Sequence, residues 1–368
     1  MISFWVNRPG AFGIENYLQE RGKPIADRVQ VRLYDWGSLE AGGGAQIFSS
    51  LDQLTGGELE GLSALHARLS QLNPPPQLLN DPCRSLIRYE LLQRLADQGL
   101  NNFRAYRADQ RDAVRSYPVF VRENRGHNGS LTELLESEKE LDKALLALRI
   151  RGYDREDLLV VEFCDTSDAD GVFRKYAAFR VGNAIIPCHL MTSRDWSVKH
   201  SSSETTLQML QEELEFHERN RFEPWLRSVF GLAGIEYGRL DFGSHNGRPQ
   251  AWEINTNPTL GRNPHNPRRA VPPELKELRE HTRDLWHSRL RQAFLELDQQ
   301  PETGRVQVQL DAGLLRRIAK ETGRAARSKQ VRARLQPLYR MRLVAPLRAA
   351  VRRWLSSKLR RGPATPRR

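Results

Sequence analysis

Residues 235–258 contain two strand-like segments separated by a short turn, and this hairpin constrains the fold more than any other feature of the sequence. Successive residues of a strand point to opposite faces, so Arg239 and Asp241 share one face of the first segment. For the same reason, Glu253 and Asn255 share one face of the second segment. The register of the hairpin therefore decides whether all four side chains meet.

The length of the turn sets this register in a regular ladder. A two-residue loop at Asn246-Gly247 would place Asp241 opposite Trp252 and would turn Glu253 to the other face. A three-residue loop with Gly247 in the left-handed conformation would place Asp241 directly opposite Glu253. We predict the three-residue loop, and with it a shared site for the two carboxylates.

Two carboxylates in direct opposition repel each other unless a cation neutralises them. Asp241, Glu253 and the side-chain amide of Asn255 offer only oxygen ligands, which Mg²⁺ prefers. Mg²⁺ held by few protein groups usually completes its shell with water and phosphates, so this set predicts a magnesium–nucleotide site. The alternative is an ordinary surface hairpin that carries acidic residues.

The remaining patterns alternate between strands and amphipathic helices, which predicts the α/β (α+β) class. The predicted strands are residues 29–34, 46–50, 117–122, 158–163, 174–181 and 184–190. The predicted helices are residues 59–72, 81–99, 133–149 and 204–230, the second beginning at Asp81-Pro82 and ending at Gly99.

The net charge of +12 is concentrated in one region. Residues 301–368 hold 19 Lys and Arg against 3 Asp and Glu, so the preceding 300 residues carry −4. Apolar residues between 344 and 359 recur at helical spacing, which predicts a basic helical extension that packs on the main body. Two alternatives stay open for residues 305–361: binding to an anionic membrane surface, favoured by Trp354, and binding to nucleic acid through phosphates. Residues 362–368 are expected to be disordered.

Three separated cysteines, Cys83, Cys164 and Cys188, match neither a disulfide framework nor a zinc site. They indicate a reducing compartment. The sequence has no apolar run near the roughly 20 residues of a membrane-spanning helix, and its start lacks the layout of a signal peptide. We therefore expect a cytoplasmic protein, with peripheral membrane attachment as the alternative. The oligomeric state cannot be predicted from the sequence.

Several motifs together resemble the ATP-grasp superfamily. Asp241 followed twelve residues later by Glu-Ile-Asn-Thr-Asn-Pro at 253–258 resembles the metal-binding end of that fold. Asn80-Asp81-Pro82 resembles the start of the ATP-grasp domain, and the strand 119–122 with the loop 126–130 resembles the segment that closes over the phosphates. Residues 160–164 resemble the strand whose end holds adenine.

The resemblance spans about residues 80–265. It implies an ATP-grasp domain at 80–300, preceded by a small α/β domain at 1–79 and followed by a basic, partly helical extension at 301–368. It also implies one or two Mg²⁺ ions, with Mn²⁺ as an alternative, held by Asp241, Glu253 and Asn255 against the phosphates of ATP.

The resemblance further implies the remaining site residues. The catalytic cations would be Arg122, Lys175 and Arg239. Phosphate would be bound by the loop residues Gly126, His127, Asn128, Gly129 and Ser130, together with Arg122 and Lys175. Adenine would be read by the backbone of Glu162, Phe163 and Cys164. Arg122 departs from the family, which usually has a lysine at this place, and Arg180 is a weaker candidate for phosphate contact.

ATP-grasp enzymes generally phosphorylate a carboxylate to an acyl phosphate, which an amine or a thiol then attacks. The resemblance thus implies an ADP-forming ligase acting on a small-molecule or peptide carboxylate. Arg122 favours one alternative, a catalytically reduced ATP-binding sensor or scaffold, and the basic tail favours another, a membrane- or nucleic-acid-associated adaptor. Minor candidates for substrate contact are His127, Trp196, Lys199 and Arg262, whereas His189 is expected to be structural.

Overall fold

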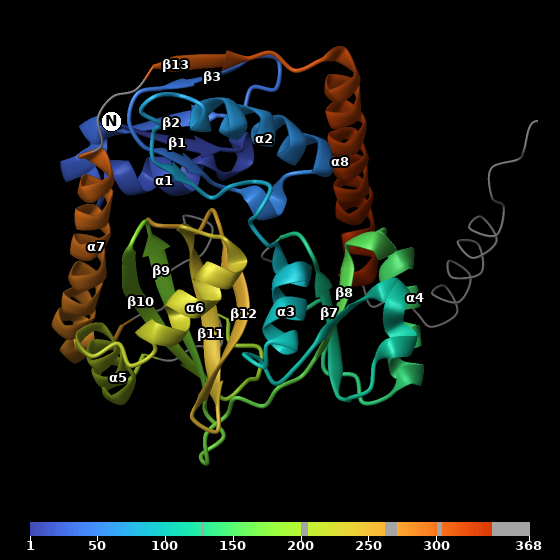
Figure 1. Ribbon diagram of the computed structural model, residues 1–368. Helices are drawn as coiled ribbons and strands as arrows, with labels where there is room; N and C mark the ends of the chain where they lie inside the picture. Colours follow the sequence, from blue (N-terminus) through green and yellow to red (C-terminus); the bar gives the residue numbers. More distant parts are fainter. Residues whose placement is uncertain (127–128, 200–204, 262–270, 300–303, 341–368) are drawn as a thin grey trace, which may run out of the picture.

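The computed structural model describes residues 1–126, 129–199, 205–261, 271–299 and 304–340. Three larger sheets and one two-stranded sheet, with their helices, form the described part of the molecule (Figure 1). A parallel sheet lies at the top of this view, a four-stranded antiparallel sheet lies below it, and a small three-stranded sheet lies beside the second. The mixed α/β class predicted from the sequence is confirmed.

The first unit is the parallel sheet, with strand order β2-β1-β4-β5. Its strands are β1 (Ile2–Val6), β2 (Val29–Leu33), β4 (Gln46–Phe48) and β5 (Leu78–Leu79). All five residues of β1 are buried, as expected for the central strand of a parallel sheet that is covered on both faces. The helix α1 (Ala11–Gln19) packs with Phe4 on one face, and α2 (Gly56–Ser70) packs with Trp5 on the other.

The second sheet has the strand order β10-β9-β11-β12. Its strands are β9 (Phe173–Val181), β10 (Ala184–Ser193), β11 (Tyr237–His245) and β12 (Arg248–Asn255). On one face, β9 and β11 share a core with the first unit and with α7 (Lys276–Asp298). Against the other face pack α3 (Arg88–Asp97), α5 (Leu207–Glu218) and α6 (Glu223–Ala233).

The third sheet has the order β6-β8-β7 and is covered by α4 (Glu138–Ile150). Its strands are β6 (Ala105–Arg107), β7 (Val119–Glu123) and β8 (Leu158–Glu162). Short 3₁₀ helices complete the described elements at Arg8–Gly10, Lys23–Arg28, Leu51–Gln53, Ala108–Ala113, Arg155–Asp157 and Pro273–Leu275.

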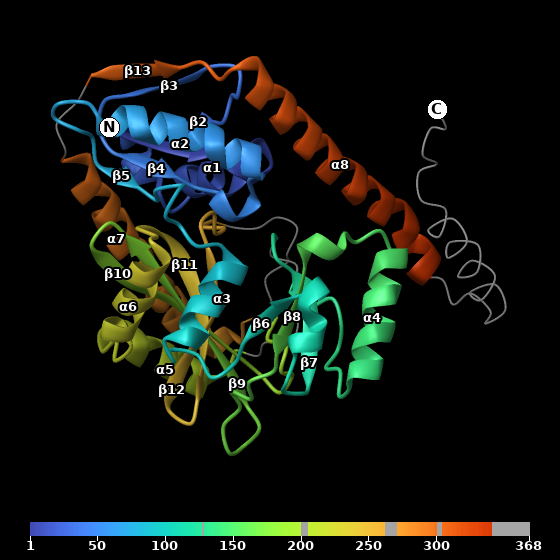
Figure 2. The same ribbon diagram turned by 45° about the vertical axis from the view of Figure 1, so that its right-hand side comes forward.

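The basic C-terminal region returns to the first unit. Strand β13 (Arg305–Val308) pairs antiparallel with β3 (Leu39–Gly42), and α8 (Ala312–Arg340) then runs from α2 to the third sheet, as Figure 2 shows. The segment 344–359 and the predicted disordered end at 362–368 lie outside the described residues. In the part of the chain that the structure describes, no helix is both long and apolar enough to span a membrane.

All four predicted helices differ from the structure in their bounds. The helix predicted at 59–72 spans 56–70, because the Thr55 side chain caps it three residues earlier. The helix predicted at 81–99 begins only at Arg88, because the Asp81 carboxylate and carbonyl hold a turn through the N–H groups of Cys83 and Ser85. The helix predicted at 133–149 begins at Glu138, where the Ser137 side chain caps it. The segment 204–230 forms two helices, α5 and α6, rather than one.

Candidate functional site

The hairpin between β11 and β12 has a two-residue turn, so the predicted three-residue loop was wrong. Asn246 and Gly247 are both left-handed, with φ of 49° and 78°, and this suits the tight hairpin turn that Asn-Gly favours. His245 pairs with Arg248 on either side of the turn. In a regular ladder, this register would have turned Glu253 away from Asp241.

A β-bulge restores the predicted pairing of the carboxylates. Phe242 pairs with Ala251, yet Asp241, the residue before it on β11, pairs with Glu253. Trp252 is the extra residue on β12, and such a bulge shifts the register by one. Asp241 and Glu253 are therefore cross-strand partners, as the sequence led us to expect, but by another local geometry.

Asp241 is a buried carboxylate held by two cations. Its side chain is 2% exposed, Lys175 Nζ lies 2.7 Å from Oδ2, and Arg239 Nε lies 2.8 Å from Oδ1. Burial alone would raise the pKa of Asp241, but the charges of Arg239 and Lys175 outweigh it and lower the pKa to about 2. Asp241 is consequently ionised at neutral pH.

Glu253 accepts hydrogen bonds from two arginines, Arg122 and Arg88. Arg122 Nη2 lies 2.5 Å from Glu253 Oε2, and Arg88 donates to the same oxygen. Burial, together with the charge of Arg88, lowers the pKa of Arg122 to about 10. The predicted phosphate contact Arg122 is thus a buried partner of a predicted metal ligand.

Sequence reasoning missed Arg88. Its guanidinium also donates to the carbonyl oxygens of Glu123, Asn124 and Gly126, at 2.6, 2.9 and 2.9 Å. Arg88 occupies the first position of α3, where the helix dipole disfavours a cation. Because the sequence predicts this helix to begin at Asp81-Pro82, Arg88 falls inside it, and no sequence signal marked the residue.

Asn255 lies at the end of β12, opposite Arg239. It is 8% exposed, and its side-chain oxygen accepts a hydrogen bond of 2.8 Å from the backbone N–H of Asn257. The amide therefore shapes the chain directly after the strand and lies on the same strand as Glu253.

The donor chemistry of Asp241, Glu253 and Asn255 fits Mg²⁺, because all three present hard oxygen atoms. The local charge adds a condition. Arg88, Arg122, Lys175 and Arg239 surround two carboxylates, which leaves a net charge of +2. This positive charge would repel a divalent cation that binds alone. It would not repel a complex of the cation with a polyphosphate, because the phosphates make the complex anionic.

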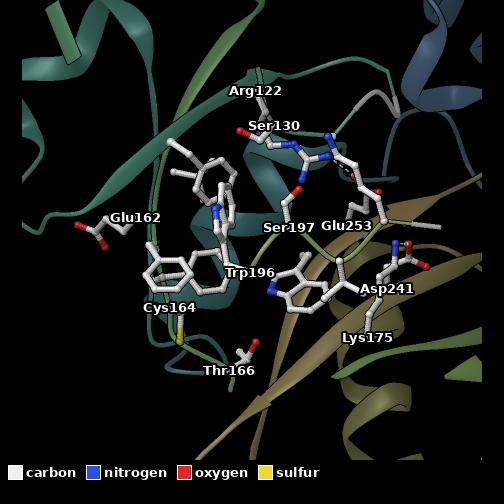
Figure 3. Close-up of a pocket in the computed structure, with 18 of the residues that line it drawn as sticks. Arg122, Ser130, Glu162, Cys164, Thr166, Lys175, Trp196, Ser197, Asp241 and Glu253 are labelled. Carbon is white, nitrogen blue, oxygen red and sulfur yellow. Dashed lines mark hydrogen bonds and ion pairs between the residues drawn. The ribbon is translucent and has the colours of Figure 1, made fainter. Parts of the chain in front are cut away.

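A cavity of about 490 Å³ lies between the second and third sheets and opens onto these residues (Figure 3). It is lined by many of the residues singled out from the sequence: Arg122, Gly129, Ser130, Glu162, Phe163, Cys164, Lys175, Trp196, Lys199, Asp241 and Glu253. Gly126, Arg239 and Asn255 do not line it. Arg239 pairs with Asp241, Asn255 lies two residues after Glu253 on β12, and Gly126 accepts a hydrogen bond from Arg88, the partner of Glu253. His127, Asn128 and Arg262 lie outside the described residues.

The cavity has a charged end and an aromatic end. In Figure 3, Asp241, Lys175, Glu253 and Arg122 lie toward one side and Glu162 and Cys164 toward the other. At the aromatic end the Trp196 ring lies 5.1 Å from the Phe120 ring and 5.9 Å from the Phe163 ring, measured between centroids. This polarity suits a ligand with an anionic group at one end and a flat ring at the other.

Part of the backbone of the segment predicted to bind adenine already forms hydrogen bonds within the protein. The N–H groups of Glu162 and Phe163 donate to the carbonyls of Arg104 and Pro118, both at 2.9 Å. These two N–H groups are therefore not available to a bound base, which corrects part of the expectation for 162–164. Burial raises the pKa of the Cys164 thiol to about 11, so the side chain is a neutral part of the wall.

The described part of the predicted phosphate loop is bent by two left-handed glycines. Gly126 has a φ of 111° and Gly129 a φ of 77°. A Cβ on Gly129 would lie 3.0 Å from Lys199 Cε, so the end of the Lys199 side chain lies against this glycine. Lys199, a minor candidate in the sequence, thus joins the cavity wall beside the loop.

Two other candidates have structural roles. Arg180 donates to the carbonyls of Gly182 and Ile235, both at 3.0 Å, and so fixes the end of β9. His189 Nδ1 lies 3.2 Å from Cys188 Sγ, and burial holds the pKa of His189 well below its ordinary value.

No protein-family model and no curated protein matches this chain. Solved structures do. D-alanine–D-alanine ligase from Helicobacter pylori matches at 13% identity and a TM-score of 0.44, over 82% of this chain and 99% of its own. The ATP complex of the Bacillus anthracis D-alanine–D-alanine ligase matches at 13% identity and a TM-score of 0.41, over 79% of this chain and 98% of its own.

A RimK domain ATP-grasp protein from Sphaerobacter thermophilus also matches, at 13% identity and a TM-score of 0.40, over 78% of this chain and 96% of its own. These likenesses concern the fold, at low identity.

Proposed function

We propose that this chain is an ATP- and Mg²⁺-dependent ligase whose nucleotide lies in the cavity between the second and third sheets. The observation that supports this most directly is the cross-strand pair Asp241–Glu253, ringed by four cations at the charged end of that cavity. The family resemblance of the same residues supplies the identity of the ligand.

The charge balance supports a polyphosphate over a simple anion. Four cations neutralise only two carboxylates. A phosphate chain can therefore bind Lys175, the partner of Asp241, and Arg122, the partner of Glu253, without leaving a charge buried and unpaired. Lys175 and Arg122 line the cavity and would turn toward the phosphates. Asp241, Glu253 and Asn255 would then hold Mg²⁺, which supplies neutralisation of the phosphate charge.

The reaction implied by the resemblance is a phosphoryl transfer followed by an acyl transfer. A substrate carboxylate oxygen attacks the γ-phosphorus, and ADP leaves. The nitrogen of an amine, or the sulfur of a thiol, then attacks the acyl carbon and releases inorganic phosphate and a proton. Lys175 and Arg122 would position the phosphates, and Arg239, which orients Asp241, lies near enough to stabilise negative charge that develops beside it.

The experiment measures ADP release with Mg²⁺–ATP and a library of carboxylates, amines and thiols. We expect Asp241→Asn and Glu253→Gln to lower the rate at least 100-fold, since each removes a charge that must hold the metal. Asp168→Asn is the matched control, because Asp168 also pairs with an arginine, Arg174, but does not line this cavity. Full turnover in both site variants would refute the proposal.

A second candidate is an ATP-binding sensor without turnover. The observation that favours it is the buried Arg122, which replaces the usual lysine and whose guanidinium is already bonded to Glu253. Calorimetric binding of the non-hydrolysable analogue AMP-PNP, with no ADP release across the whole library, would favour this candidate. An Arg122→Lys variant that gained turnover would identify the substitution as its cause.

A further inference from the structure

Seven cations of α8 fall into two groups that differ in their partners, and Lys329, exposed on another face, belongs to neither. The first group is bonded to the main body. Arg317 pairs with Glu60 at 2.8 Å, Arg324 pairs with Asp154 at 2.5 Å, and Arg332 pairs with Glu123. These arginines attach α8 to the first unit at one end and to the third sheet at the other.

The second group is Arg316, Lys320, Arg327 and Arg334, which we name the basic stripe. All four residues are exposed, and within the described part of the chain none of them forms an ion pair. At about 100° per residue, the four positions fall within about 40° around the helix. They extend over about 27 Å of its length, at about 1.5 Å per residue.

The basic stripe lies on a different face from the bonded arginines. Measured from Arg316, the positions of Arg317, Arg324 and Arg332 lie about 80° to 160° around the helix. Glu321, the acidic residue of α8, is on the bonded face, where it accepts a hydrogen bond of 2.8 Å from the backbone N–H of Gly57. The fold therefore orients the stripe outward, and α8 itself places no acid on it; Asp311, directly before the helix, interacts with Arg316 alone of the four.

The chemistry of the stripe favours a polyanion over a lipid bilayer. A helix that lies in a membrane interface needs an apolar face to insert. Beside the stripe, Val331 is the large apolar side chain that the structure shows as strongly exposed, at 45%, whereas Ile318 is buried at 5% against the first unit. A regular row of phosphates requires only the charges that the stripe offers.

We propose that the basic stripe binds the phosphate backbone of a nucleic-acid duplex. A duplex carries one negative charge per about 1.7 Å of its axis, so about 16 phosphates lie along 27 Å and each of the four cations can meet one. The stripe contains no side chain pattern that reads base edges, so the binding is independent of sequence. This surface is separate from the proposed nucleotide cavity and does not depend on the function proposed for it.

The test measures binding of the full chain to a fluorescently labelled 24-base-pair DNA duplex by anisotropy, between 50 and 200 mM NaCl. The stripe variant carries Arg316→Gln, Lys320→Gln, Arg327→Gln and Arg334→Gln. The control variant carries Lys23→Gln, Lys139→Gln, Lys143→Gln and Arg149→Gln, four exposed cations elsewhere, so both variants lose the same net charge and keep residues 341–368.

We expect the plot of log K against log salt to be shallower by about 3 to 4 for the stripe variant, because each lost phosphate contact removes about 0.9. Its affinity at 100 mM salt should fall at least 100-fold, and the control should stay within a few-fold of the parent chain. A charge-retaining variant with Arg316→Lys, Arg327→Lys and Arg334→Lys should bind like the parent chain, which separates loss of charge from loss of the helix.

Three outcomes would overturn the proposal. The first is a parent chain that does not bind the duplex, and the second is an equal loss of affinity in the stripe and control variants. The third is unchanged duplex binding by the stripe variant with loss of sedimentation on vesicles of phosphatidylcholine and phosphatidylserine, which would assign the stripe to a membrane.

Discussion

Arg88 offers the sharpest test of how the candidate site is held together. Its side chain is 4% exposed and it donates to three loop carbonyls, those of Glu123, Asn124 and Gly126, as well as to Glu253. Replacement by methionine keeps most of the apolar stem and removes all of these hydrogen bonds. The loop between β7 and the predicted phosphate-binding segment should then open more readily.

The size of the effect follows from the contacts. Loss of one partner of a buried ion pair costs about 3–5 kcal/mol. The lower end applies here, because Arg122 still neutralises Glu253 and is relieved of the repulsion by Arg88 that lowers its pKa. A local destabilisation of about 3 kcal/mol corresponds to a rise of about 100-fold in the opening equilibrium.

Hydrogen exchange measured by mass spectrometry reads this equilibrium directly. Amides in a peptide that covers 119–126 should exchange about 100-fold faster in Arg88→Met, while amides of β1 keep the rate of the parent chain. Arg107→Met is the control, because Arg107 pairs with Glu90 at the surface at 3.0 Å and such pairs contribute at most about 1 kcal/mol. An increase below about fivefold in Arg88→Met would refute the role that we give to Arg88.

Two further predictions concern stability. Burial, with the charge of Arg289, lowers the pKa of His217 to about 4, so the unfolded chain binds a proton from about pH 6.5 downward while the folded chain does not. This titration of His217 alone should lower stability by about 3 kcal/mol between pH 7 and pH 4, and urea unfolding of His217→Phe should show a weaker dependence on pH. Gly234→Ala should destabilise the fold by about 1–3 kcal/mol in the same assay, because φ is 61° and the new Cβ would lie 2.9 Å from the Arg84 carbonyl oxygen. Gly231→Ala, with no atom near its added Cβ, should leave stability unchanged or raise it; equal losses in both variants would contradict the reasoning.

Local patterns predicted most of the elements, because strand alternation and helical periodicity are properties of short segments. The segment at 158–163 forms β8, and the hairpin places Asp241 opposite Glu253. The central strand β1 was not predicted, although all five of its residues are buried and apolar or small. A continuous buried run has no alternation, so its short length gives a weak signal.

The features that the sequence could not reveal depend on distant contacts or on alternative local geometries. Both an odd turn and an even turn with a bulge bring Asp241 to Glu253, and only the three-dimensional structure distinguishes them. Arg88 meets Glu253 across 165 positions of the chain, and no local rule links them. Of the arginines that neutralise the two carboxylates, Arg122 and Arg239 were thus singled out from the sequence, but Arg88 was not.

The pairing of β13 with β3 has a consequence for synthesis of the chain. Val306 faces Ala41, so the partner of β3 is translated 265 residues after it. At a translation rate of about 5–20 residues per second, the edge of β3 stays unpaired for roughly 13–53 s. Such an edge is a template for pairing with other chains, so the time needed to complete this small sheet sets a window for misassembly in the cell.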